Sequence, residues 1–371
     1  MVHAAITAPK QNLWSKWSVT RASYRTPKTW RARRRCSFSV AHQQGGSAGA
    51  SDLHLTCESL VAKTSTRMAF VQRCSLAHAH ESGIWTCAWS PAHGGQLVTG
   101  GNDEKVRCFA AGNGRVERVS KYEGHELGVT SVTVSADGTL AASSSLDSTI
   151  RIIDLEHSEE LKTIDAGPVE AFTVALSSTG RYIASGTQGG SVNLFSVSTG
   201  GCDSTLSTPG KSFAMSVAIS PDAKLVACGH ADGAIHVLDV EKQAVLARLD
   251  GHTASVRSLA FSTDGGNLIS GSDDALANLY DVRSLTPVAA FQGHASWVLG
   301  AAFSPDGSLV ASCSADRSVR IWDVANRTCL QSLPDCHQEM AWSVAFDPGS
   351  SKRFASVGDD GAVCVYEANG A

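Results

Sequence analysis

A unit of 42 to 45 residues repeats seven times between Ala79 and Tyr366. Each copy begins with a Gly-His dipeptide or its replacement, whose second residue is His80, His125, Gly167, Gly210, His252, His294 or His337. Within each copy, short runs of alternating apolar and polar residues are bounded by Gly, Asp, Asn and Pro. This pattern predicts four short antiparallel strands and no helix. A period of this length is typical of WD repeats.

Seven such units predict an all-β fold, a seven-bladed WD-repeat β-propeller, because one unit alone cannot bury its apolar strand faces. The last copy ends at Tyr366, which leaves too few residues for a fourth strand in its blade. The segment Phe70–Leu76 precedes the first copy and has the composition of a strand. We therefore expect it to be the outer strand of the seventh blade and to close the ring.

The copy that begins at Gly293 combines four residue types that can form a buried hydrogen-bonded chain. They are His294, Ser312, Asp316 and Trp322, and we expect no other copy to complete the set. A hydrolase would need an exposed nucleophile and an oxyanion site, so we interpret this set as a structural element of the blade. Other histidines, including His230 and His236, are scattered without a ligand motif, and the sequence predicts no metal, no cofactor and no enzyme activity.

Charge divides the chain into two parts. Residues 1–50 hold nine Lys and Arg and no Asp or Glu, whereas from Met68 onward 20 Lys and Arg stand against 33 Asp and Glu. We expect residues 1–67 to be a disordered basic extension and residues 68–371 to be the propeller. The extension is consistent with a transit peptide, a basic tail, or non-native sequence upstream of a start at Met68. An acidic propeller is a poor candidate for direct binding of nucleic acid.

The eleven cysteines contain no Cys-x-x-Cys pair, and most fall in predicted strands. They are typical of small, reduced core residues. No apolar run approaches the length of a membrane span, so we expect no membrane association.

Departures from the repeat consensus identify a closer resemblance. They include Asp165-Ala166-Gly167-Pro168-Val169 in the third copy and Thr208-Pro209-Gly210-Lys211 in the fourth. Over about residues 70–367 the chain resembles the WD-repeat subunit of the superkiller complex, the WD repeat-containing protein 61 type. That resemblance implies a non-enzymatic adaptor in the nucleus and cytoplasm, present as a single propeller within hetero-complexes. The implied partners are the tetratricopeptide-repeat scaffold and the RNA helicase of the superkiller complex in 3′-to-5′ mRNA decay. The implied partners also include subunits of the polymerase-associated-factor complex in transcription elongation and histone modification.

Three positions of each copy are expected to face one rim of the propeller: three and five residues after the Gly-His position, and the residue before the Asp of the tight turn. Many of these positions hold apolar side chains, which mark protein-binding surfaces. The predicted partner-binding residues are Trp85, Phe172, Phe213, Met215, Arg257, Asp273, Trp297, Leu299, Met340, Trp342 and Asp359. The resemblance implies partner segments of the Gln-Arg-x-x-hydrophobic type. Trp85, Phe172, Trp297, Leu299 and Trp342 would form the apolar pocket, and Asp273 or Asp359 would bind the arginine.

A second class of function fits the same fold. The chain would then be a WD-repeat substrate receptor of a ubiquitin ligase or another signalling scaffold. The proteins that co-purify with the chain distinguish the two.

Overall fold

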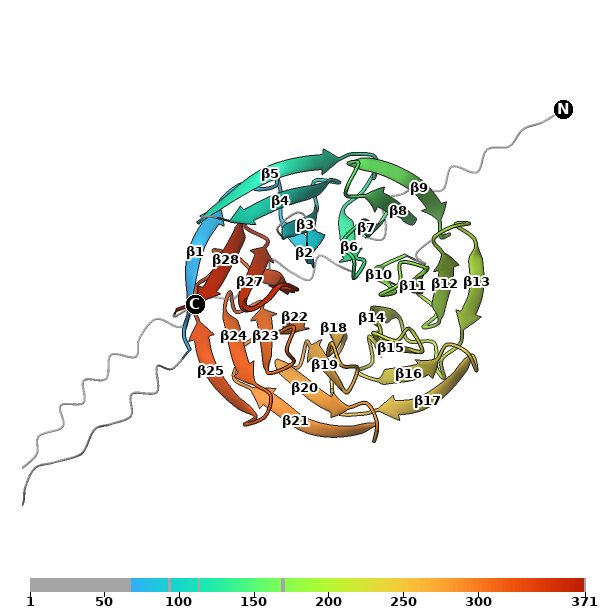
Figure 1. Ribbon diagram of the computed structural model, residues 1–371. Helices are drawn as coiled ribbons and strands as arrows, with labels where there is room; N and C mark the ends of the chain where they lie inside the picture. The colour runs from blue at the N-terminus through green and yellow to red at the C-terminus, as the bar shows by residue number, and fades with distance from the viewer. Residues whose placement is uncertain (1–67, 93–94, 113, 168–170, 370–371) are drawn as a thin grey trace, which may run out of the picture. The chain divides into compact units, whose positions relative to one another are not determined.

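The computed structural model describes residues 68–92, 95–112, 114–167 and 171–369. All regular structure in these ranges is β, arranged as seven four-stranded antiparallel sheets. Figure 1 shows the sheets as blades of a closed ring, with the first strand of each blade near the axis and the fourth at the periphery. The predicted seven-bladed WD-repeat propeller is confirmed. The expected extension, residues 1–67, lies outside the described residues.

Blades 1 to 7 follow the order of the sequence. Blades 1 to 3 are β2(Ile84–Ser90), β3(Gln96–Gly101), β4(Val106–Gly112), β5(Arg115–Tyr122); β6(Val129–Val134), β7(Leu140–Ser145), β8(Thr149–Asp154), β9(Glu159–Asp165); and β10(Thr173–Leu176), β11(Tyr182–Gly186), β12(Val192–Ser196), β13(Cys202–Leu206). Blades 4 and 5 are β14(Ala214–Ile219), β15(Leu225–His230), β16(Ile235–Asp239), β17(Ala244–Leu249); and β18(Val256–Phe261), β19(Asn267–Ser272), β20(Leu276–Asp281), β21(Thr286–Gln292). Blades 6 and 7 are β22(Val298–Phe303), β23(Leu309–Ser314), β24(Val319–Asp323), β25(Thr328–Leu333); and β26(Ala341–Asp347), β27(Ser350–Gly358), β28(Val363–Ala368), β1(Phe70–Leu76).

The ring is closed by β1, as expected. This strand pairs antiparallel with β28, so that Phe70 lies opposite Ala368 and Leu76 opposite Val363. In Figure 1 the first strand of the chain, in blue, lies beside the last, in red. The side chain of Gln331 on β25 fastens β1 to blade 6: its Oε1 accepts from the backbone N–H of Phe70 and its Nε2 donates to the Phe70 carbonyl, both at 2.7 Å. Blades 6 and 7 are therefore joined through β1.

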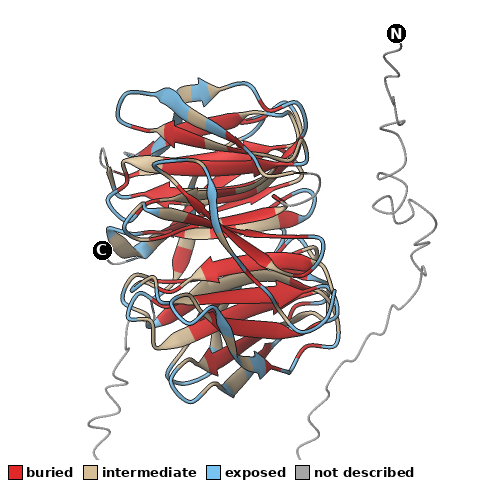
Figure 2. Cartoon of the chain, turned by 90° about the vertical axis from the view of Figure 1, so that its right-hand side faces the viewer, coloured by how far each residue is buried: buried red, intermediate tan, exposed pale blue. Residues whose placement is uncertain are grey.

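The apolar core is distributed between adjacent blades. Each cluster of buried apolar residues draws on two neighbouring sheets, for example Ile150 and Ile164 of blade 2 with Val174 and Ile183 of blade 3. Figure 2 shows the buried residues inside the stack of sheets and the exposed ones on loops and outer strands. Each blade buries the face of the next, which is why the repeat is stable only as a ring.

Turns between first and second strands repeat one hydrogen-bonding device. In blade 6 the hydroxyl of Ser304 donates to Asp306 and accepts from the backbone N–H of Leu309. Gly307 completes the turn at φ 70°, a left-handed conformation that favours glycine.

Candidate protein-interaction face

The loops that enter the first strands and the Asp turns that follow the second strands meet on one face of the propeller, which we call the rim face. In six blades the N–H of the residue before the Asp donates to the carbonyl of the third residue after the Gly-His position, at 2.9 to 3.1 Å. Blade 7 shows the pattern with Asp359 and Met340, and blade 6 shows it with Ala315 and Trp297. Two of the three expected positions are therefore hydrogen-bonded neighbours.

The third position, five residues after the Gly-His position, falls in a β-bulge. In six blades the pairing between first and second strand skips this residue; in blade 1, Ile84 and Thr86 are paired and Trp85 is not. A bulge re-aims a side chain away from the regular alternation of a strand. It places residues such as Trp85, Trp342 and Arg257 at the rim end of the innermost strands.

We call the apolar side chains on the rim face of blades 6, 7 and 1 the apolar sector; two exposed leucines, Leu127 and Leu146, also lie on this face in blade 2. Trp297 and Met340 are exposed, at 40% and 37% of their surface. The half-buried rings of Trp85 and Trp342 are 6.3 Å apart across the junction of blades 1 and 7. Exposed apolar side chains of this size on neighbouring blades are typical of a protein-binding surface.

A second aromatic pair lies at the junction of blades 3 and 4. The rings of Phe172 and Phe213 pack edge to face with centroids 5.1 Å apart, and both are half-buried. Two other predicted rim residues, Met215 and Leu299, have only 6% of their surface exposed. This differs from the prediction that they face solvent. Neighbouring side chains cover both residues, so they lie beneath the surface of the rim face.

The predicted acidic rim residues have different surroundings. Arg257 forms a two-pronged ion pair with Asp273, with N–O distances of 2.9 and 2.7 Å, and its guanidinium lies 6.0 Å from the Trp297 ring. Asp273 therefore already holds an arginine of its own chain. The carboxylate of Asp359 has no hydrogen-bond or ion-pair partner among the described residues. It lies directly over Gly83, where a Cβ atom would collide with it.

Asp359 borders a hollow of about 440 Å³ between blades 7 and 1, beside the apolar sector. Its lining includes Glu81 and Gln338 and is mainly polar. An unpaired carboxylate next to exposed apolar side chains suits a cationic side chain on a partner segment.

The hydrogen-bonded chain predicted in blade 6 is present. The indole of Trp322 donates to Ser312, Ser312 bonds Nε2 of His294, and Nδ1 of His294 bonds Asp316, at 2.8, 2.8 and 3.0 Å. Because the carboxylate can only accept, His294 carries its proton on Nδ1 and Ser312 donates to Nε2. Burial acts to raise the pKa of Asp316, but hydrogen bonds, first from His294, hold it well below its usual range.

Blade 7 has a related set, with a tyrosine where blade 6 has the tryptophan. In blade 7, Ser356 bonds both His337 and the hydroxyl of Tyr366, and His337 bonds Asp360. A tyrosine hydroxyl can replace the indole N–H at this position because both reach the serine.

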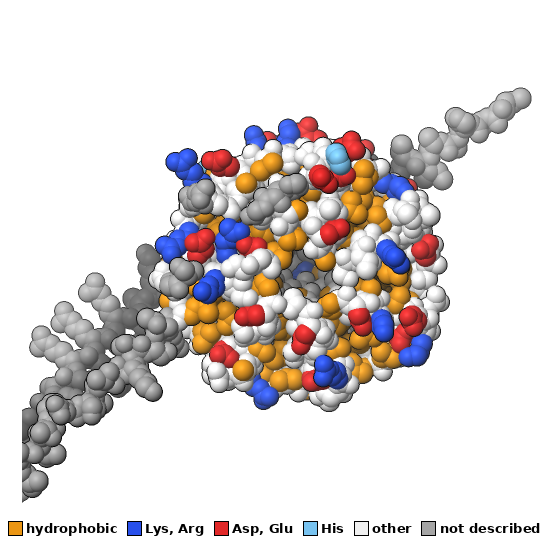
Figure 3. Space-filling model, viewed as in Figure 1, with side chains coloured by type: hydrophobic (Ala, Val, Ile, Leu, Met, Phe, Trp, Pro, Cys, Tyr) orange, Lys and Arg blue, Asp and Glu red, His pale blue; other side chains and the backbone are white. Residues whose placement is uncertain are grey.

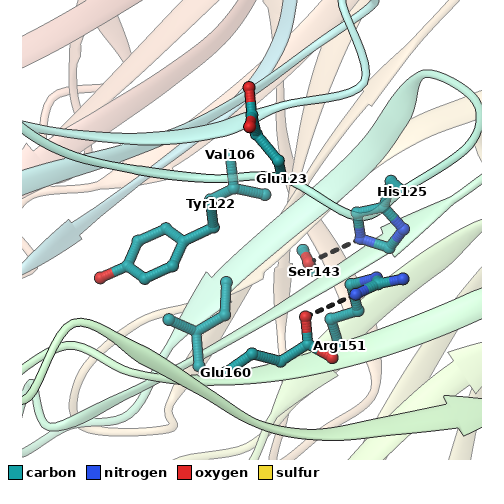
Figure 4. Close-up of a pocket in the computed structure, with 8 residues that line it drawn as sticks. Val106, Tyr122, Glu123, His125, Ser143, Arg151 and Glu160 are labelled. Carbon is teal, nitrogen blue, oxygen red and sulfur yellow. Dashed lines mark hydrogen bonds and ion pairs between the residues drawn. The ribbon is translucent and has the colours of Figure 1, made fainter.

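In blade 2 there is little room for a substrate beside the corresponding histidine and serine. Ile153 stands where blade 6 has Trp322, and the cavity beside His125 and Ser143 measures about 10 Å³, the size of one water molecule. Figure 4 shows that Arg151 and Glu160 pair with each other across it.

Metal sites and membrane spans are two other features that a chain of this length can carry. Over the described ranges we find no group of three His, Cys, Asp or Glu side chains arranged to hold a metal ion. In those same ranges no helix has the length and apolarity needed to cross a bilayer. On the face drawn in Figure 3, acidic and basic side chains are interspersed around a central opening, and no continuous basic surface is visible.

Comparison with known proteins agrees with the architecture. The family model described as WD domain, G-beta repeat matches residues 72–109, 116–154, 285–323 and 327–367, and a model described as Vps8 beta-propeller matches residues 169–285. Four segments of this chain therefore match the WD repeat, in agreement with the seven-bladed propeller of the structure.

The matches to individual relatives cover only part of each protein. The chain is 36% identical over 190 residues to WD repeat-containing protein SL1-17 of Schistosoma mansoni and 37% identical over 201 residues to WD repeat-containing protein VIP3 of Arabidopsis thaliana. Each match covers 50% of this chain and 62% of the relative. A shorter match, 32% over 108 residues, covers 29% of this chain and 35% of Superkiller complex protein 8 of Dictyostelium discoideum.

Proposed function

We propose that this protein is a non-enzymatic adaptor that binds a segment of a partner protein on the apolar sector of its rim face. The observation that carries the proposal is the placement of Trp297 and Met340, which are exposed on adjacent blades beside the Trp85–Trp342 pair. Ordered aromatic side chains lose little conformational entropy on binding and often dominate the energy of an interface. Leu299 lies beneath this sector in blade 6, while Met215, Phe172 and Phe213 belong to a separate part of the rim face, at blades 3 and 4.

The partner segment carries an arginine or lysine close to an apolar side chain. Asp359 receives the cation, because Asp273 is already held by Arg257. Arg257 also supports the Trp297 ring from one side, so we assign it a positioning role.

The partners we propose are those of a superkiller-type complex, namely a tetratricopeptide-repeat scaffold and an RNA helicase, together with subunits of a polymerase-associated-factor complex. The similarity to Superkiller complex protein 8 of Dictyostelium supports this proposal. It would place the protein in both nucleus and cytoplasm, in mRNA decay and in transcription elongation, with nucleic acid contacted only by its partners.

Affinity purification followed by mass spectrometry tests the proposal with wild type, Trp297→Ala and Met340→Ala. We expect wild type to recover the scaffold with the helicase, or the elongation-complex subunits. Each variant should bind at least about tenfold more weakly, since a central anchor contributes about 2 kcal/mol or more. Val119→Ala, which removes an exposed apolar side chain from the outer strand β5, is the matched control and should bind as wild type.

Equal recovery by Trp297→Ala and wild type, with the fold intact by circular dichroism, would exclude the apolar sector as the site. Recovery of cullin adaptors in place of these partners would instead identify a ubiquitin-ligase receptor.

A further inference from the structure

Blade 4 contains a buried pair of histidines that the other blades lack. His230 ends β15 and His236 lies on β16, and each has only 2% of its surface exposed. Nδ1 of His236 is 2.9 Å from Nε2 of His230, and Nδ1 of His230 is 2.9 Å from the carbonyl oxygen of Ser212. The sequence had suggested that these histidines were unrelated, but the hairpin brings them together.

The hydrogen bonds fix where the protons are. A carbonyl can only accept, so His230 donates from Nδ1, and its Nε2 accepts from Nδ1–H of a neutral His236. Nε2 of His236 is then left with a lone pair, and it is buried with no hydrogen-bond partner among the described residues. This nitrogen is the one position in the pair that can take up a further proton.

No carboxylate stands ready to balance that proton. In five blades the Gly-His histidine contacts an Asp, as His252 contacts Asp274 at 2.9 Å, but blade 4 has Gly210 in place of that histidine. Burial, then His230 and Arg248, keep the pKa of His236 below its ordinary value, while Asp232 and Asp250 act weakly in the opposite sense.

The titratable and charged groups on the elements packed around the pair do little to neutralise a positive charge on His236. Asp250 is exposed and paired with Arg248, and Arg257 on β18 is paired with Asp273. The strand β14 has no titratable residue. These groups are Lys211 on the entering loop, Cys228 and His230 on β15, Asp232 in the following turn, Arg248 on β17, Asp250 after it, His252 on the loop that packs against Gly233, and Arg257 on β18.

The entering loop of blade 4 lacks both residues of the Gly-His dipeptide. In blades 2, 5 and 6 the residue equivalent to His236 is Arg151, Asn278 or Arg320, and its side chain closely approaches the glycine of the entering loop. In blade 4, Pro209 replaces that glycine and Gly210 replaces the histidine, and no atom lies within 4 Å of where a Cβ on Gly210 would be. Movement of this loop would expose the buried pair to water, which favours the charged form of a histidine.

We propose that blade 4 is a proton-sensitive element of the propeller: uptake of a proton by the His230–His236 pair releases the segment Thr208–Phe213 from the rim face. Ser212 is the residue that His230 holds, and Phe213 follows it directly and packs on Phe172. Release of the segment therefore separates the aromatic pair of blades 3 and 4. This inference does not depend on the identity of any partner.

Hydrogen exchange measured by mass spectrometry at pH 7.5 and 5.5, corrected for intrinsic exchange rates, tests the proposal on the full chain. We expect amides of residues 208–213 to exchange at least about fivefold faster at pH 5.5, relative to the equivalent residues 250–255 of blade 5. His236→Asn, which copies Asn278 of blade 5, keeps a donor to His230 and cannot titrate, so it should abolish the difference. His157→Asn, at an exposed histidine of blade 2, should retain it.

An equal exchange ratio at both pH values would overturn the proposal, as would the same acid response in His236→Asn. Imidazole ¹⁵N spectra of the wild type provide a second test should His236→Asn fail to fold. We expect both histidines to carry the proton on Nδ1 at pH 7.5, with His236 still neutral at pH 6. An Nε2–H tautomer at either histidine, or ordinary titration of His236, would refute the proposal.

Discussion

A single aspartate organises the tight turn and the entering loop of most blades. In blade 6, Asp316 accepts from the ring of His294, from the backbone N–H of Ala295, and from the hydroxyl and N–H of Ser318. Four donors converge on one carboxylate, so its loss leaves several buried donors without partners.

We expect Asp316→Ala to lower the free energy of unfolding by about 2–4 kcal/mol, because buried unpaired donors each cost about 1–3 kcal/mol. Asp232→Ala in blade 4 is the matched control. Asp232 occupies the same place in the turn but has no histidine, and its carboxylate accepts from the N–H of Ala234 at 3.2 Å. Its loss should cost under about 1 kcal/mol. Urea unfolding measures both, and equal losses would contradict the importance of the histidine contact.

The hydrogen-bonded set of blade 6 could be predicted from the sequence, because each of its positions was expected to hold one particular residue type. Spacing located His294, Ser312, Asp316 and Trp322, because the repeat keeps these residues in register. It missed Tyr366, which makes a similar contact through a different atom. It also missed the His230–His236 pair, because their contact arises from the pairing of two strands rather than from a motif.

The closing strand β1 depends on contacts from two blades. Its backbone pairs with β28, and its first residue is held by the side chain of Gln331. A second link crosses the closure from blade 7 to blade 1: Arg353 bonds Asp347 and the carbonyl of Ala111.

We expect Gln331→Ala to destabilise the propeller by about 1–2 kcal/mol, because it leaves the N–H and carbonyl of Phe70 without this partner. The effect should be local, with faster hydrogen exchange in β1 than in β5. Gln292→Ala, at an exposed glutamine on β21, should change neither quantity. Unchanged protection of β1 in Gln331→Ala would show that pairing with β28 alone holds the strand.

The strands and their order were predictable from the alternation of residues, including the assignment of Phe70–Leu76. The bulges that aim Trp85 and Trp342 were not, since an unpaired residue leaves no mark on the apolar pattern. The ion pair of Arg257 with Asp273 was also not predicted, although both residues had been placed on the same rim. Sequence positions show which residues share a face but not which of them neutralise each other.

As a whole, the propeller buries several histidines in the neutral form. Burial lowers the pKa of His80, His125, His236 and His252 below the ordinary value near 6.5. The unfolded chain thus binds more protons than the folded one below pH 6.5, and folding stability falls as the pH decreases. Asp103 affects stability at lower pH than the histidines do. Burial acts to raise its pKa, but hydrogen bonds, first that from His80, lower it to about 2. The stability that the Asp103 carboxylate contributes is therefore lost as the pH falls below about 4.

We expect the urea midpoint of unfolding to be lower at pH 5.0 than at pH 7.5. The loss has an upper bound of about 2 kcal/mol for each histidine that stays neutral in the folded state. His157, whose pKa is raised by Asp154, acts in the opposite sense but is fully exposed. A midpoint independent of pH between these values would show that the buried histidines are protonated without cost.

The pairing of β1 with β28 also has a consequence for how the protein is made. The two partners are separated by almost the whole propeller, from Phe70 to Ala368. A ribosome that adds about 5–20 residues per second needs roughly a quarter of a minute to a minute to synthesise that stretch. Throughout that interval the backbone N–H and C=O groups at the edge of β1 have no partner strand. Chaperones or rapid synthesis must therefore keep this edge from pairing with another molecule.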